Sequence, residues 1–312
     1  LTHAIFSNSP FARNGWETKD RYAVISKYLT KKHSCNKNYI PHMINMPECD
    51  ENDNNREKYG IPDDAVVFGR YGGSDSFDIG YVHEAIRELL SEDNKIYFLF
   101  ANTDKFYEHE RIIYVPQLID MQEKARFIQS CDAMIHARTV GETFGISIGE
   151  FSFYNKPIVT NFSVPVANLL SDNCHVEILG DKGFIYHSKD EAYKIIKTLY
   201  EEGIDKNKNW RAYDDYTPEK VMKHFDSCFL KDVASNLPES NNAPSYTTWV
   251  VNLERRMDRR IKIDKILVKN KMYNHNIKYF KAVDGNKLKQ TKELTDLFKD
   301  NDFGWRRGVI GC

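Results

Sequence analysis

The stretch from residue 132 to residue 160, DAMIHARTVGETFGISIGEFSFYNKPIVT, decides how the chain folds. It begins with a short apolar run at 132–137 and ends with another at 157–160, and such runs are typical of buried strands. Between them lies a loop of small and polar residues, followed by a helix predicted over 145–153. A strand, a helix and a second strand in this order predict two parallel strands joined by a helical crossover.

The same alternation continues on both sides of this stretch. The helix predicted over 79–90 carries an apolar stripe at helical spacing, formed by Ile79, Val82, Ile86, Leu89 and Leu90. Further strands are predicted at 65–69, 95–101, 112–115, 176–178 and 184–186, and further helices at 121–130 and 190–202. Strands that alternate with helices through short loops predict an α/β fold with a Rossmann-like, doubly wound, mostly parallel sheet.

Composition excludes several classes of protein. The 312 residues include 44 basic and 45 acidic side chains, so the net charge of −1 favours neither nucleic acid nor an acidic membrane surface as a partner. No apolar run approaches the ~18 residues that span a bilayer. Six scattered cysteines lack metal-ligand spacing, which argues against a disulfide framework or a zinc site. With no export signal at the start, we expect a cytoplasmic protein with reduced thiols.

Two polar stretches divide the chain. Residues 48–58 (ECDENDNNREK) are acidic and rich in asparagine, and predict a solvated loop that leads into a helical turn; residues 236–245 (NLPESNNAPS) are typical of a linker. A second α/β segment follows, with strands predicted at 247–253 and 277–282 around a basic helix at 254–268. The expected domains are 1–47, 48–235, a linker at 236–246, and 247–312. The last is too short to be complete, so we expect the chain to be truncated at both ends.

The loop and helix start at 141–150 (GETFGISIGE) are the strongest candidate for a binding site. Backbone N–H groups at such a helix start attract a diphosphate. Glu150 could accept hydrogen bonds from both hydroxyls of a ribose, while Glu142 could reach a sugar or the group beyond the phosphates. The eight residues between the two glutamates rotate about 80° beyond two helical turns, so the two side chains would serve different parts of a ligand. The alternative is a helix with an acidic start that binds nothing.

These residues resemble a known motif. Glu142, Phe144, Gly145, Ile146 and Glu150, followed by KPIV at 156–159, are similar to the Glu–seven residues–Glu motif of retaining GT-B glycosyltransferases of family 4. The resemblance covers about 41–225, with 41–47 similar to the crossover from an N-terminal half. It implies the C-terminal, nucleotide-binding half of a GT-B fold. By motif position, it implies that Glu150 binds the ribose, that Glu142 contacts the donor sugar as the catalytic residue, and that backbone around Phe144, Gly145 and Ile146 meets the diphosphate.

A second glycine-rich segment, GRYGG at 69–73, follows the strand predicted at 65–69. Its spacing is not that of a dinucleotide fingerprint. It is similar to a Gly-Arg segment of family 4, which implies that Arg70 and Gly72 bind the donor and that Arg70 stabilises the leaving diphosphate. In the family a lysine follows five residues after that arginine, but here the position is Asp75. Either another residue compensates, or activity is weak, or the segment is a plain turn.

Two alternatives stay open at this site. Residues 145–149 match G-x-S-x-G, the nucleophile elbow of α/β-hydrolases, with Ser147 as the nucleophile. That elbow requires a strand that runs directly into the serine, whereas polar and small residues at 138–145 intervene here. The other alternative is a module that binds a nucleotide sugar without transferring it, which the absent lysine favours.

The segment 252–260 (NLERRMDRR), together with FKAVDG at 280–285 and RGVIGC at 307–312, resembles the start of glycosyltransferase family 25. That resemblance implies a GT-A fold and a divalent metal such as Mn²⁺, whose Asp-x-Asp ligands would lie beyond residue 312. Arg255 and Arg259 could approach a second nucleotide, or they form a solvated basic helix face. The GT-B module is expected to need no metal. The expected partners are a nucleoside diphosphate sugar and a glycan or protein acceptor.

Overall fold

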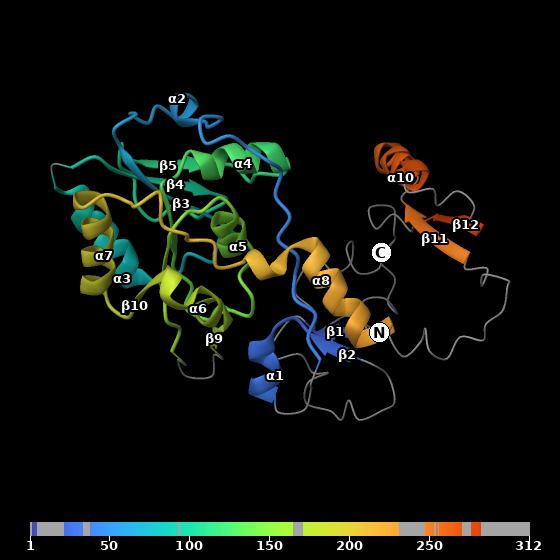
Figure 1. Ribbon diagram of the computed structural model, residues 1–312. Helices are drawn as coiled ribbons and strands as arrows, with labels where there is room; N and C mark the ends of the chain where they lie inside the picture. The colour runs from blue at the N-terminus through green and yellow to red at the C-terminus, as the bar shows by residue number, and fades with distance from the viewer. Residues whose placement is uncertain are drawn as a thin grey trace, which may run out of the picture. The chain divides into compact units, whose positions relative to one another are not determined.

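The computed structural model describes residues 2–4, 22–33, 38–92, 94–164, 171–230, 247–252, 254, 256–269 and 276–281 (Figure 1). The chain divides into two compact units, Leu1–Asn236 and Leu237–Cys312. In the described part of the chain, no helix is both long and apolar enough to cross a membrane.

A sheet of six parallel strands forms the centre of the first unit. The strands are β3 (Val66–Tyr71), β4 (Ile96–Ala101), β5 (Ile112–Val115), β6 (Ala133–His136), β8 (Ile158–Asn161) and β10 (Gly183–Tyr186). Their order across the sheet is β10-β8-β6-β3-β4-β5, and every neighbouring pair is parallel. The chain thus starts in the middle of the sheet, builds outward in one direction, and returns to build in the other. This is the doubly wound Rossmann order, and it confirms the predicted fold class.

Helices cover both faces of this sheet. The helices of the first unit are α1 (Lys27–His33), α2 (Arg56–Tyr59), α3 (Gly80–Leu90), α4 (Met121–Gln129), α5 (Ile146–Phe153), α6 (Cys174–Leu179), α7 (Lys189–Glu201) and α8 (Pro218–Phe225). Figure 1 shows α3 and α7 together on one face, and α4 and α5 on the other. Helices on both faces bury the central strands of the sheet, which explains why these strands are continuous apolar runs in the sequence.

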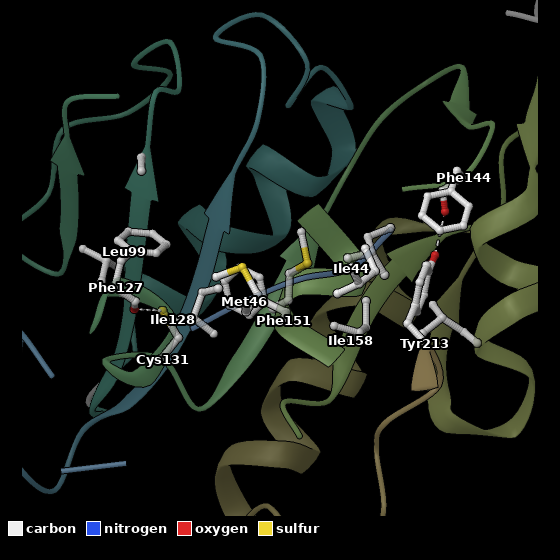
Figure 2. Packing of buried hydrophobic residues seen from close by; sticks show 14 of the residues in the cluster. Ile44, Met46, Leu99, Phe127, Ile128, Cys131, Phe144, Phe151, Ile158 and Tyr213 are labelled. Carbon is white, nitrogen blue, oxygen red and sulfur yellow. Dashed lines mark hydrogen bonds between the residues drawn. The ribbon is translucent and has the colours of Figure 1, made fainter. Parts of the chain in front are cut away.

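The core accordingly has two layers. On the α3 and α7 side, Phe68, Phe98 and Phe100 point from β3 and β4 toward the helices. On the other side, Phe127 of α4 and Phe151 of α5 pack on the strands. Figure 2 shows that Ile44 and Met46, from the segment that precedes α2 and β3, belong to this second layer. The segment 41–47 is thus part of the core of the first unit.

Side chains at the helix starts fix where the helices begin. The carboxylate of Asp120 accepts hydrogen bonds from the N–H groups of Gln122 and Glu123 at the start of α4. Ser188 and Thr217 cap α7 and α8 in the same way. These caps satisfy N–H groups that have no partner within the helix.

The prediction of a strand at 176–178 is wrong, because these residues lie within α6. Its buried residues Cys174, His175 and Leu179 show helical spacing, but a segment as short as Val-Glu-Ile at 176–178 does not distinguish a strand from a helix. The sequence prediction also did not include α8, although Thr217 and Pro218 are a typical helix start, nor the four short strands that form two parallel pairs outside the main sheet. These strands are β1 (Thr2–Ala4) with β2 (Tyr22–Val24), and β7 (Gly141–Glu142) with β9 (Asp172–Asn173).

The second unit contains the predicted strand, helix and strand. β11 (Thr247–Asn252) and β12 (Asn276–Lys281) pair in parallel over six residues, with Thr247 opposite Asn276, and α10 (Met257–Lys269) lies between them in sequence. A parallel pair with a helical crossover is the βαβ unit that this pattern predicts.

A methyl group at Gly141 tests the close approach of β7 to β9. Gly141 has φ +64°, and a Cβ there would lie 2.0 Å from the carbonyl oxygen of Asp172. Gly141→Ala should therefore lower the free energy of unfolding by about 2 to 5 kcal/mol, because left-handed strain and overpacking add. At Gly203 (φ +81°) nothing lies within 4 Å of such a Cβ, so Gly203→Ala should cost only about 1 to 2 kcal/mol. Equal losses of the two variants in urea unfolding would contradict this packing.

Candidate functional site

The predicted site residues gather where the strand order reverses. β3 and β6 are neighbours, but the chain leaves them in opposite directions, toward β4 and toward β8. The loops that follow their carboxyl ends therefore separate, and in doubly wound sheets the crevice between such loops is where ligands bind. Arg70 and Gly72 lie at the carboxyl end of β3, and the motif 142–150 follows β6. The structure thus brings the two glycine-rich segments to one edge of the sheet.

Helix α5 begins at this edge without a side-chain cap. Gly145 precedes it in a left-handed conformation with φ +84°, which any other residue adopts only with strain. The N–H groups of the first turn, starting with Ile146 and Ser147, have no acceptor within the helix. The Tyr213 hydroxyl donates to the carbonyl oxygen of Phe144 at 2.7 Å and holds the turn in place (Figure 2). The turn therefore presents fixed N–H donors and the positive end of the helix dipole.

The side chains of this turn differ in exposure. Phe144 is buried and packs edge-on against Tyr213 and Tyr216, so only its backbone is available to a ligand. Ile146 is exposed on the first turn. Ser147 lies inside α5, and residues 137–145 separate this helix from β6. A nucleophile elbow places its serine directly after a strand, so Ser147 does not have that geometry.

Glu142 lies between two basic side chains. Its Oε1 is 2.9 Å from Nη1 of Arg138 and 3.4 Å from Nε2 of His136. Burial raises the pKa of Glu142, but His136 and Arg138 outweigh burial and bring the pKa down to about 2. On its other side, Nδ1 of His136 lies 2.8 Å from the Thr160 hydroxyl, which fixes the ring. Glu142 is therefore a carboxylate at any physiological pH.

Glu150 has the opposite environment. It is buried on α5, and its Oε1 accepts a hydrogen bond from Nζ of Lys124 at 3.1 Å. Burial raises the pKa of Glu150 to about 7 and lowers the pKa of Lys124. The Lys124 ammonium lies 5.0 Å from the ring centre of Tyr71, the last residue of β3. The buried Tyr71 hydroxyl has no hydrogen-bond partner among the described residues.

Arg70 is buried, with 3% of its surface exposed. Its Nη2 donates to the carbonyl oxygen of Gly73 and to the Ser76 hydroxyl, both at 2.7 Å. Its Nη1 donates to the loop after β4, at Asn102 and Thr103. Burial lowers the pKa of Arg70 to about 10, with Glu142 opposing this effect. A Cβ at Gly72 would lie 2.8 Å from Arg70 Nη2, so Gly72 leaves space for this guanidinium.

Sequence analysis missed three side chains of the site: Lys124, His136 and Arg138. Arg138 and His136 carried a signal, because both stand at the carboxyl end of the strand predicted just before the motif. Lys124 carried none, since it occupies a polar position of an amphipathic helix, and only the folded structure shows that it reaches Glu150.

The first unit also contains a cavity that is separate from this site. This cavity, of about 530 Å³, is found at the amino ends of the strands, lined among others by Arg56, Asp132, Tyr154 and Lys156. It therefore lies at the opposite edge of the sheet from Glu142 and Glu150. In the second unit, Arg259 is exposed on α10, whereas Arg255 lies outside the described residues.

The low pKa of Glu142 predicts how stability depends on pH. Because the folded state holds the carboxylate more strongly than the unfolded state does, its contribution is present above the ordinary pKa and is lost as pH falls toward about 2. At pH 7, Glu142→Gln should lower the free energy of unfolding by up to roughly 3 kcal/mol, and at pH 3 by less than about half of that.

Urea unfolding of both proteins at the two pH values checks this. Glu177→Gln, which removes an exposed ion pair with Lys31, is the control and should cost less than about 1 kcal/mol. A loss for Glu142→Gln that is the same at pH 3 and pH 7 would contradict the described environment.

Several solved structures share the fold of this chain. No protein-family model and no curated protein sequence matches the chain. Among solved structures, it is similar to Anabaena Alr3699/HepE in complex with UDP-glucose, with a TM-score of 0.55 and 16% identity over 75% of this chain and 71% of that one. It is also similar to a glycosyltransferase from Rickettsia africae, with a TM-score of 0.56 and 14% identity over 76% and 71%. The chain therefore has the Rossmann-like α/β fold of GT-B glycosyltransferases.

Proposed function

We propose that the first unit binds a nucleoside diphosphate sugar at the carboxyl ends of β3 and β6, as the donor-binding half of a glycosyltransferase. One observation carries this proposal: the edge at which the strand order reverses carries both the uncapped start of α5 and the two glutamates of the motif. Helix starts of this kind bind phosphate groups. The similar Anabaena protein has been crystallised with UDP-glucose and with UDP and glucose, and the shared fold supports the same class of ligand here.

The two glutamates suit different parts of such a donor. The N–H groups around Phe144, Gly145 and Ile146 would bind the diphosphate. Glu150 would accept the ribose hydroxyls after the Lys124 ammonium moves away. Tyr71, whose ring lies beside Lys124, has an unpaired hydroxyl that offers a further polar contact. An unpaired buried hydroxyl costs about 1 to 3 kcal/mol, which a ligand oxygen would recover.

Glu142 would orient the transferred sugar as the catalytic residue. Its pKa of about 2 keeps it ionised, so it can accept hydrogen bonds from sugar hydroxyls and stabilise positive charge at the reacting carbon. The resemblance to family 4 supports transfer of a hexose with retention of configuration, without a metal in this unit. The acceptor would be a glycan or a protein. For the second unit, the resemblance to family 25 supports binding of a nucleotide near Arg255 and Arg259, together with the Mn²⁺ that a complete domain of that family would hold.

Thermal unfolding with a panel of UDP-, GDP- and ADP-sugars tests the donor site. At pH 8 Glu150 is ionised, since its pKa is about 7. A donor at ten times its dissociation constant should stabilise the protein by about 1.4 kcal/mol, which raises Tm by roughly 2 to 4 °C. Glu150→Gln should remove most of this shift, because a neutral amide accepts hydrogen bonds from the ribose less well.

Glu177→Gln is the matched control and should keep the full shift. No shift with any of the donors, or a shift that Glu150→Gln leaves intact, would contradict the proposed site. A transferase should also release the sugar from a bound donor, and Glu142→Gln should abolish that release. A module that only binds the donor should release no sugar.

A further inference from the structure

We propose that Arg138 contacts the distal phosphate of the bound donor and supplies the cation that the loop after β3 lacks, while Arg70 acts as a positioning residue. This inference rests on the proposed function, since it assigns a residue within the same donor site. The sequence predicted instead that Arg70 contacts the diphosphate.

Arg70 is poorly placed to touch a ligand. Only 3% of its surface is exposed, and both terminal nitrogens of its guanidinium donate to protein oxygens. These bonds tie the loop after β3 to the loop after β4, so the side chain fixes the shape of the crevice. A ligand could reach this guanidinium only by breaking the hydrogen bonds that hold the two loops.

The loop after β3 offers no other cation. Residues 72–76 (GGSDS) contain no basic side chain, and Asp75 is exposed there. A diphosphate near this loop would therefore meet a negative charge, and like charges repel. A nearby cation must offset this charge if the site is to hold a diphosphate.

Arg138 lies where such a cation is needed. It follows β6 at the carboxyl edge, and its side chain is 34% exposed. Of the five N–H donors of its guanidinium, one is directed to Glu142 at 2.9 Å. In the described part of the chain no hydrogen bond of the remaining donors to protein is seen. Its charge also reaches Arg70, whose pKa it lowers, so the two guanidinium groups share one neighbourhood.

The backbone of Arg138 is fixed in advance. The side-chain amide of Asn161, at the end of β8, accepts from the Arg138 N–H at 3.1 Å and donates to its carbonyl oxygen at 3.0 Å. The N–H of Gly141 donates to the same carbonyl oxygen at 2.9 Å. The side chain therefore extends from an anchored point, and a cation held in place stabilises developing charge without reorganisation.

The position of Arg138 beside Glu142 indicates which phosphate it meets. If Glu142 contacts the sugar and Glu150 the ribose, the phosphate next to the sugar lies on the Arg138 side. Lys124 lies at the ribose end instead, where it is bonded to both carboxylate oxygens of Glu150. The leaving group gains negative charge at the phosphate next to the sugar when the glycosidic bond breaks, so a guanidinium there favours transfer.

Comparing a nucleoside diphosphate with the monophosphate of the same base isolates this contact. Arg138→Gln should weaken binding of the diphosphate about tenfold to a hundredfold and change binding of the monophosphate by less than about twofold, as measured by calorimetry. Arg138→Lys keeps the charge but loses the planar fork, and should give an intermediate loss. Arg126→Gln is the matched control, because Arg126 is equally exposed (32%) but is bonded to Asp53 and Glu123; it should change neither affinity.

A double-mutant cycle with Glu142→Gln separates direct contact from an effect through Glu142. If Arg138 binds phosphate, Arg138→Gln still weakens diphosphate binding about tenfold or more in the Glu142→Gln background. An Arg138→Gln effect that vanishes in that background, or that is equal for the diphosphate and the monophosphate, overturns this inference alone. Wild-type protein that binds neither nucleotide overturns the proposed function, and this inference with it.

Discussion

The parallel pairing of β3 with β6 is the constraint on which the candidate site depends. These two strands lie side by side in the middle of the sheet, yet they are separated in sequence by two strands and two helices. Gly69 of β3 pairs with Met134 of β6, and a Cβ at Gly69 would lie 2.2 Å from Sγ of Cys131, which precedes β6. Since the chain leaves the pair in opposite directions, the loops after Tyr71 and His136 diverge and create the crevice. Every proposed contact with the donor starts from one of these two strands, from the loops after them, or from α4 and α5.

Within the crevice, each glutamate of the motif is paired with a different base, and the two environments shift the pKa in opposite directions. Glu142, between Arg138 and His136, is held ionised with a pKa of about 2, whereas burial raises the pKa of Glu150 to about 7. The first environment suits a carboxylate that must stay charged during a reaction. The environment of Glu150 suits a carboxylate that exchanges Lys124 for a ligand. A carboxylate buried so deeply is stabilised by any hydrogen-bond partner that takes the place of water.

Much of the architecture could be predicted from sequence, because strands buried on both faces are continuous apolar runs and their helices have apolar stripes. The run at 95–101 and the stripe at 79–90 illustrate this. The three residues at 176–178 were too few to show a period, and α8 was overlooked. For the site, the motif located both glutamates, but it did not show that Arg70 is buried. That depends on contacts with Asn102 and Thr103 in the loop after β4, which local patterns do not contain.

A crystal structure of this chain with a bound nucleoside diphosphate tests the central claim most directly. The account predicts the diphosphate at the start of α5, within hydrogen-bond distance of backbone N–H groups of 144–147, with the ribose at Glu150 in the place of the Lys124 ammonium. A nucleotide bound instead in the cavity at the amino ends of the strands, beside Arg56 and Lys156, or a Lys124–Glu150 pair left intact by a nucleotide bound elsewhere, would contradict it.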